Sequence, residues 1–200
     1  MVYAGLWRRV AANIIDGLVT SVAVYALLIP VLLVFGVGAW SVPDGAHGQG
    51  AALGLMAFVY GTSLLLPALY TAWMQSSRHQ ATLGKLACGI KVVRSDGSQL
   101  RFWRSLLRYG VYVAVVLLTL GLGLLASGLM AGLTRRKQAP HDLACDTLVV
   151  DRWAFTAHPE HQRDRLDTVS IVVLALYGIC VVIALAAVVF LVGMIRLGQH

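Results

Sequence analysis

The sequence predicts an all-α integral membrane protein with three to four transmembrane helical segments, a small cytoplasmic hairpin and an interfacial amphipathic helix. The chain of 200 residues is 58% hydrophobic and only 12% charged, whereas soluble domains carry about a quarter charged residues. The apolar residues are gathered into four long segments, and many basic residues flank these segments. A water-soluble core of this size could not bury so much apolar surface.

Each of the four apolar segments is longer than the roughly 20 residues that cross a bilayer core as a helix. In lipid the backbone must satisfy its own hydrogen bonds, so the crossing segments are predicted to be helical. Pro30 and Pro67 lie inside the first two segments, where each removes a backbone donor and is expected to kink its helix. The segments cover about residues 10–40, 51–74, 109–133 and 169–195.

The distribution of Lys and Arg predicts the orientation of the chain. Arg8 and Arg9 precede the first segment and residues 75–108 carry seven basic side chains, whereas residues 36–50 carry none. By the positive-inside rule the N-terminus and residues 75–108 are cytoplasmic, and residues 41–50 are outside. The net charge of +7 is therefore assigned to topology and to contact with lipid headgroups. No nucleic-acid site is predicted, because no aromatic-rich binding module accompanies the basic residues.

The third apolar segment leaves two alternatives open. If it crosses once, the basic residues at 135–137 lie outside, against the positive-inside rule. Glycines near its middle allow a bend at residues 121–123, after which the chain would return to the cytoplasmic side, covered by protein. We favour this re-entrant path. It is expected to bring His141 and Asp142 close to Arg9 or Lys85.

The stretch after the second segment predicts a short strand, a turn and a helix. Residues 90–93 form an apolar strand-like run, and Asp96-Gly97 is a strong signal for a hairpin turn. Residues 101–108 place three arginines, including Arg108, on one face of an interfacial amphipathic helix. A second strand-like stretch at residues 146–151 is the natural partner of the first strand, which favours the re-entrant path because both strands must lie on one side.

Four motifs occur in the order found in the RDD family of small membrane proteins, which this sequence resembles over about residues 5–150. They are WRRVAANIID, TLGKLACGIKVV with a following SDG, RSLLRY and RRKQAPHDLACDTLVV. The family is named for one Arg and two Asp, and by motif position these are Arg9, Asp16 and Asp142. Further residues that match the family pattern are Thr82, Gly84, Lys85, Gly89, Gly97, His141 and Thr147.

The sequence departs from the family pattern at two positions. Leu86 stands where a basic residue is common, and Asp146 stands where a small residue usually precedes the Thr.

The predicted organisation is an RDD-like membrane domain, a polar linker and an additional C-terminal transmembrane helix. These parts cover residues 1–150, 151–168 and 169–196. We expect a multi-pass protein of the bacterial cytoplasmic (inner) membrane with a cytoplasmic N-terminus.

A polar stripe enters the first apolar segment. Arg9 and Asp16 are two helical turns apart, roughly 10 Å along one face, with Asn13 between them. A lone carboxylate inside hydrocarbon is costly unless it is paired, so Arg9 is expected to extend towards Asp16 with Asn13 bridging. Two interpretations stay open. The stripe is either a structural pair that positions the helix or a proton or cation site in which Asp16 titrates.

No catalytic residue, metal site or cofactor is predicted, and the protein is not expected to be an enzyme. His141 and Asp142 are neighbours that do not face one point on a helix, and no nucleophile accompanies them, so an interfacial turn is expected. Residues 158–161, with two histidines around Glu160, are expected to form a solvated loop. The three cysteines show no metal-binding spacing and are expected to be free thiols.

Two functions stay open. The resemblance implies transport of a cation or proton, because some family members are linked to cation/proton exchange, with Asp16 and Asp142 as candidate site residues. Three or four spans are too few to enclose a pathway easily, so this function requires a homo-oligomer or a membrane-protein partner besides the lipid bilayer. Small residues in the second and third segments offer packing faces. The alternative is a non-catalytic accessory or assembly subunit of a larger membrane complex, which the resemblance equally allows.

Overall fold

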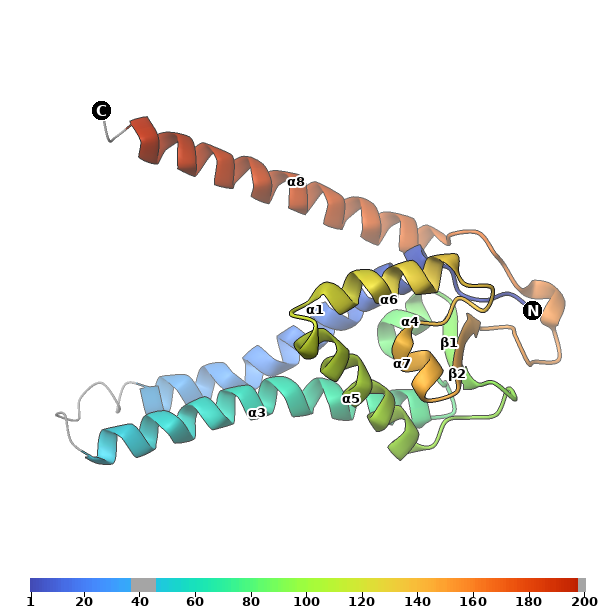
Figure 1. Ribbon diagram of the computed structural model, residues 1–200, viewed down its shortest axis with the longest axis horizontal. Helices are drawn as coiled ribbons and strands as arrows, with labels where there is room; N and C mark the ends of the chain where they lie inside the picture. The colour runs from blue at the N-terminus through green and yellow to red at the C-terminus, as the bar shows by residue number, and fades with distance from the viewer. Residues whose placement is uncertain (37–45, 198–200) are drawn as a thin grey trace.

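Three helices are long and apolar enough to cross a membrane in the computed structural model, which describes residues 1–36 and 46–197. They are α1 (Leu6–Val31), which continues into a π-helical turn (Leu32–Gly36), α3 (Ala46–Ser76) and α8 (Thr168–Leu197). All three extend away from the end of the molecule that holds the strands and the N-terminus (Figure 1). The predicted fold class, a helical multi-pass membrane protein, is confirmed. The predicted external loop at residues 41–50 falls mostly outside the described residues.

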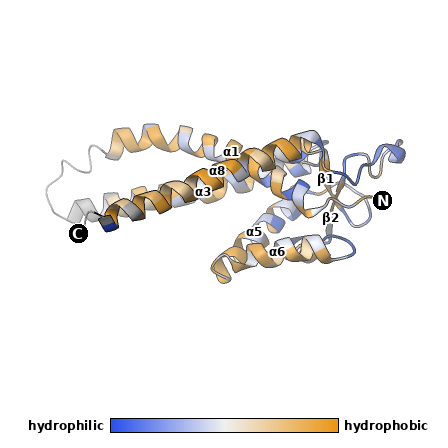
Figure 2. Ribbon diagram, turned by 90° about the horizontal axis from the view of Figure 1, so that it is seen from above, coloured by the Kyte–Doolittle hydropathy of each residue, from blue (hydrophilic) through white to orange (hydrophobic). Residues whose placement is uncertain are grey.

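The third apolar segment forms a helical hairpin and does not cross as a single helix. Helices α5 (Phe102–Leu118) and α6 (Leu122–Leu133) are joined by a tight turn in which Leu120 and Gly121 have φ angles of 49° and 90°. This left-handed backbone suits Gly121 because glycine has no Cβ. Figure 2 shows the hairpin beside the long helices. The predicted bend is confirmed, and α6 returns the chain to the end of the molecule from which α5 starts.

A two-stranded sheet joins segments that are far apart in the sequence. Strands β1 (Ile90–Arg94) and β2 (Thr147–Asp151) pair antiparallel, with Ile90 opposite Asp151 and Arg94 opposite Thr147. The predicted pairing is confirmed. The turn at Asp96-Gly97 also forms, since the Gly97 N–H donates to the Arg94 carbonyl at 2.9 Å. The residues after it are not a strand, so the partner of β1 is β2 and no strand pairs with β1 across this turn.

The buried core lies under the sheet and against the first turns of α1. It includes Ala11, Ala12, Ile90, Val92 and Val149. Two short helices, α4 (Leu83–Ala87) and α7 (Pro140–Ala144), complete this end of the molecule, and a 3-10 turn (Pro159–His161) lies in the linker before α8. In the three long helices no more than 6% of the apolar window is buried within the chain. The stability of the monomer therefore depends mainly on the packing around the sheet.

The strand pairing leads to a test of topology. We expect cysteines introduced at the exposed positions Ser98 and Arg136 to react with a membrane-impermeant maleimide from the same side of the membrane. The variant chains would have the three native cysteines replaced by serine, and an added cysteine at Leu64 in α3 serves as a control for unreactive, lipid-level positions. Labelling of positions 98 and 136 from opposite sides would contradict the hairpin.

Candidate functional site

Asp142 is fully buried and is held by arginines from two other helices. Arg9 of α1 donates from Nη1 to Oδ2 at 2.7 Å, and Arg108 of α5 donates from Nε to Oδ1 at 2.9 Å and from Nη2 to the same oxygen. The Ala139 N–H also donates to Oδ2, at 3.1 Å. Burial alone would raise the pKa of Asp142, but Arg108 and Arg9 lower this pKa below its usual range. Asp142 is therefore a fixed anion that ties α7 to α1 and α5.

Gln75 of α3 extends this network. Its Oε1 accepts from Arg108 Nη1 at 3.2 Å and from the Ser105 hydroxyl at 3.2 Å, and the side chain is fully buried. Because the Arg108 guanidinium can only donate, the amide oxygen has to face it, and Nε2 is the atom left over. Within the described ranges Nε2 has no acceptor. Four helices, α1, α3, α5 and α7, thus meet around one buried charge network.

Asp16 forms a second centre, where α1 packs against α3 and α4. Its Oδ1 accepts from the Tyr70 hydroxyl at 2.9 Å and from the Gly84 N–H at 2.8 Å, and its Oδ2 accepts from the Thr82 hydroxyl. Lys85 Nζ lies 3.6 Å from Oδ2 and also donates to Thr82 Oγ1. Burial lowers the pKa of Lys85 to about 8, although Asp16 acts in the opposite direction. The buried lysine therefore changes charge close to neutral pH.

The predicted pairing of Arg9 with Asp16 is wrong. Arg9 binds Asp142, Asp16 faces Lys85, and no hydrogen bond joins the exposed Asn13 to Arg9 or Asp16. Side chains on a helix point towards its N-terminus. The long Arg9 therefore extends to the start of α1, where α7 packs, whereas the short Asp16 stays where α4 packs. The seven-residue spacing places both on one face but does not bring them together.

The prediction that three arginines share one face of an interfacial amphipathic helix did not identify Arg108 as a buried residue. Arg108 is only 7% exposed and belongs to the Asp142 network, whereas Arg101 is exposed. The presence of Arg108 in the RSLLRY motif is the sequence signal that could have identified it. Tyr70 and Gln75 were missed as well, and no spacing pattern distinguishes them.

His141 and Thr147 support the Asp142 network. His141 Nε2 lies 3.6 Å from Asp142 Oδ1, and the ring packs edge-on against Tyr112. Burial, together with Arg108, lowers the pKa of His141 to about 3, so the ring is neutral at physiological pH. The Thr147 hydroxyl donates to the Asp142 carbonyl at 3.3 Å.

Arg8, whose position in the sequence indicated only the orientation of the chain, is a structural residue. Its Nη1 donates to Asp151 Oδ2 at 3.1 Å, and its guanidinium also donates to the carbonyls of Cys88, Gly89 and Arg163. Gly89, a motif residue, has a φ of 62°, and this turn directs its carbonyl towards Arg8. Arg8 therefore ties the first turn of α1 to the sheet and to the linker before α8.

A cavity of about 430 Å³ lies between α1, α3, α5 and α6. Its lining contains several predicted site residues. Asp142 itself does not line the cavity and contacts two residues that do, Arg9 and Arg108. The polar side chains that line it include Arg9, Asn13, Asp16, Tyr70, Gln75, Lys85, Arg108 and His141. Gly84 and Thr82 contribute indirectly by binding Asp16, whereas Gly89 and Thr147 support the surrounding fold.

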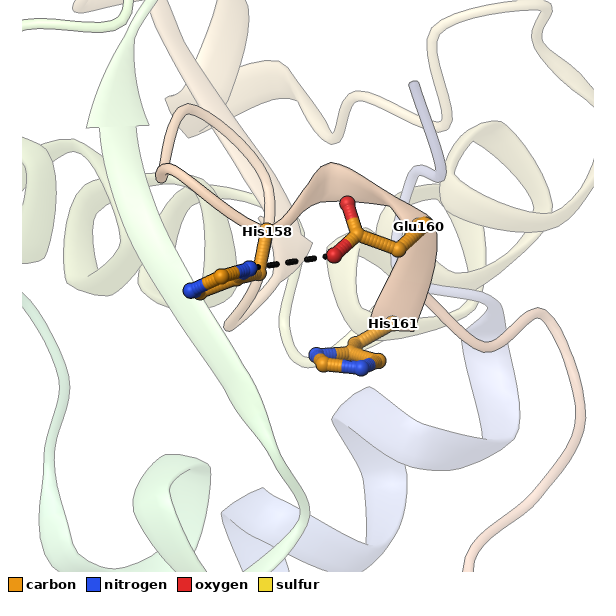
Figure 3. A group of neighbouring side chains, drawn as sticks. All are labelled: His158, Glu160 and His161. Carbon is orange, nitrogen blue, oxygen red and sulfur yellow. Dashed lines mark hydrogen bonds and ion pairs between the residues drawn. The ribbon is translucent and has the colours of Figure 1, made fainter.

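A separate group forms in the loop after β2, where His158, Glu160 and His161 point towards one another (Figure 3). His158 Nδ1 lies 3.1 Å from Glu160 Oε1, and the potential ligand atoms of the three residues lie within 4.8 Å of one another. The side chains of His158 and Glu160 are 63% and 60% exposed. We assign no metal to this group, because solvent competes freely at such an exposed site.

Comparison with known proteins gives one family and two close relatives. The model of the RDD family matches residues 3–146. YckC, an uncharacterised protein of Bacillus subtilis strain 168, is 31% identical over 146 residues, which are 73% of this chain and 83% of the relative. YxaI, an uncharacterised protein of the same organism, is 30% identical over 152 residues, which are 74% of this chain and 96% of the relative. No solved structure matches.

Proposed function

The chain belongs to the RDD family, and on this basis we propose that it takes part in the exchange of a cation for protons across the membrane, with Lys85 and Asp16 as the exchanging pair. The observation that carries the proposal is the Lys85–Asp16 contact of 3.6 Å on the lining of a cavity between helices. Ionisable residues inside membrane domains are rare, and ion pathways and proton relays are among the roles that retain them. The pKa of Lys85, about 8, allows a proton to leave under physiological conditions.

The exchange follows from the charges of the pair. When Lys85 is protonated, its ammonium group balances the carboxylate of Asp16. When the proton leaves, the carboxylate has lost its charged partner, and a metal cation is favoured in its place. The hydroxyl oxygens of Thr82 and Tyr70, which already bind Asp16, are available as further oxygen ligands. One positive charge leaves as one positive charge enters, so the net charge of the site does not change.

The proposal gives Asp142 a structural role. Its partners are arginines, which do not lose their protons in proteins, and its oxygens already accept four hydrogen bonds. The cation site is therefore assigned to Asp16 alone, and neither catalysis nor a cofactor is part of the proposed function.

The proposed setting is the bacterial cytoplasmic membrane, with the N-terminus and residues 75–108 in the cytoplasm, as the positive-inside rule favours. On this topology the C-terminal His200, which is outside the described residues, lies outside the cell.

Three spanning helices do not enclose a pathway, so transport requires a second copy of the chain or another membrane protein. An added Cβ at Gly54 or Gly61 of α3 would meet no atom within 4 Å. This leaves that face open for close helix packing.

The accessory-subunit alternative is supported by α8. None of the apolar window of this helix is buried within the chain, and Figure 1 shows it diverging from α1 and α3. A helix in this position suits contact with another membrane protein. On this alternative both charge centres only hold the fold together.

Ion flux in proteoliposomes tests the proposal. We expect a gradient of Li⁺, Na⁺ or K⁺ to drive proton movement through the wild-type protein, with a midpoint near pH 8 that reflects the pKa of Lys85. Lys85→Met should abolish proton coupling, and Asp16→Asn should abolish flux. Lys91→Met, which changes a lysine of β1 away from the cavity, is the matched control and should behave as wild type.

Two results would contradict the proposal. If the Lys85→Met variant kept the proton coupling and the pH midpoint of the wild type, Lys85 would be excluded as the proton carrier. Absence of flux in the wild-type protein with all three cations would favour the accessory-subunit alternative.

A further inference from the structure

The cavity that contains the Lys85–Asp16 pair has an excess of buried positive charge. Arg9, Lys85 and Arg108 line it, and none of them is more than 9% exposed. Among the described residues that line the cavity, Asp16 is the only carboxylate, and its oxygens already have donors. Asp142, which pairs with Arg9 and Arg108 from behind the lining, is a second carboxylate. Three cations therefore face two anions, and one positive charge is left over.

Both arginines keep donors that the protein does not use. A guanidinium has five N–H groups. Arg9 uses three of them, on the carbonyls of Ala4 and Lys137 and on Asp142. Arg108 also uses three, two on Asp142 and one on Gln75. Each arginine thus has two N–H groups with no acceptor in the described part of the chain.

Two further polar atoms on the same lining are unpaired. Gln75 Nε2 and His141 Nδ1 are buried, and neither has a partner among the residues described. His141 Nδ1 is an acceptor, because the neutral ring turns its Nε2–H towards Asp142. Gln75 Nε2 is a donor, and buried donors are almost always satisfied in folded proteins because leaving one unpaired is costly. The Gln75 amide cannot turn to relieve this, because its oxygen is held by Arg108 and Ser105. An acceptor from outside the chain would satisfy Nε2.

The position of the cavity indicates where such an acceptor comes from. Arg9 is in the first turn of α1, which begins at Leu6, so the basic side of the cavity lies at the end of a spanning helix. Hydrophilic residues gather at this end and hydrophobic residues follow along the helices (Figure 2). Lipid headgroups lie at this level of a bilayer. Apolar side chains such as Val10, Pro67 and Leu124 line the rest of the cavity.

We propose that this cavity binds a phosphate monoester, held by Arg9, Arg108 and Gln75, and carried by the lipid phosphatidic acid or by a small soluble ester. Four arginine N–H groups and one amide exceed what the two oxygens of a carboxylate or of a phosphodiester accept well, whereas a phosphate monoester presents three non-bridging oxygens. The volume of about 430 Å³ lies within the range of small-molecule sites. Phosphate binding does not depend on the proposed ion exchange.

The test compares two sources of phosphate without any ion gradient. Purified protein would be examined by native mass spectrometry in nanodiscs containing phosphatidic acid, a monoester, or phosphatidylcholine, a diester, and by calorimetry in detergent with glycerol 3-phosphate. We expect preferential retention of phosphatidic acid. Binding of glycerol 3-phosphate as well would identify the free ester as a second source, and its absence would assign the site to lipid alone.

Gln75→Glu is the diagnostic variant because it keeps the shape of the side chain and replaces the unpaired donor by an anionic oxygen. We expect it to weaken phosphate binding about tenfold or more, whereas Gln99→Glu, the same change on an exposed side chain, should leave binding unchanged. If Gln75→Glu does not fold, Gln75→Met removes the donor without adding charge. Equal retention of both lipids, or wild-type binding by a folded Gln75 variant, would overturn the proposal.

Discussion

Asp142→Asn is expected to destabilise the protein by about 3–5 kcal/mol, the usual cost of removing one partner of a buried ion pair. The substitution keeps the size of the side chain but leaves Arg9 and Arg108 without their counter-charge. Arg9 can extend from the end of α1 towards headgroups, but Arg108 is 7% exposed and is held on α5 between α3 and α7. Thermal unfolding in detergent, followed by tryptophan fluorescence, should show a midpoint lower by on the order of 10 °C.

The matched control is Asp164→Asn. Asp164 pairs with Lys137 at 3.4 Å, but its side chain is 75% exposed, and exposed pairs contribute little. Partial recovery of stability in the double variant Asp142→Asn with Arg108→Gln would show that the unpaired charge is the cause. Equal stability of Asp142→Asn and the wild type would contradict this account of the network.

The interaction of Asp142 with its two arginines also predicts that the stability of the protein depends on pH. The pKa of Asp142 is lower in the folded protein than in the unfolded chain, where a carboxyl of this type titrates near 4. Its stabilisation is therefore fully present above about pH 4 and is lost as the pH falls towards the folded-state pKa. The difference in unfolding midpoint between the wild type and Asp142→Asn should consequently narrow in acid.

Gly84→Ala is expected to disrupt the contact between α4 and α1. A Cβ at this position would lie 2.1 Å from the carbonyl oxygen of Ala12 and 2.9 Å from Asp16 Cγ. The backbone cannot yield as a flexible side chain would, so α4 has to move away. The hydrogen bond of the Gly84 N–H to Asp16 would then lengthen or break. Overpacking of this kind costs about 1–3 kcal/mol, and loss of the hydrogen bond adds about 1 kcal/mol.

Gly110→Ala is the control for this prediction. Nothing lies within 4 Å of a Cβ added at Gly110, which is exposed in the middle of α5. Alanine favours helix by up to about 1 kcal/mol over glycine, so the two substitutions should shift the unfolding midpoint in opposite directions. A Gly84→Ala protein as stable as the wild type, with ion coupling intact, would show that α4 does not need its close approach to α1.

The sequence by itself determined the membrane class, the spanning helices, the bend in the third apolar segment and the pairing of residues 90–93 with residues 146–151. These features depend on properties that are local along the chain. The length of an apolar segment decides whether a helix can cross a bilayer. A Gly-rich stretch permits the chain to reverse its direction. Strand-like alternation identifies two short strands, each of which needs a strand to pair with. Arg9, Asp16, Lys85 and Asp142 were identified through motif resemblance.

Only the tertiary structure decided which charges meet. Asp142 is 133 positions from Arg9 in the sequence, and helical spacing within α1 predicted the wrong partner, Asp16. Periodicity states which side chains share a face, but it does not state what packs against that face. For the same reason the burial of Arg108 was not predicted, because burial of one side of α5 depends on α3 and α7. The cavity between the helices exists only after these elements have packed, which is why no pattern along the chain predicted it.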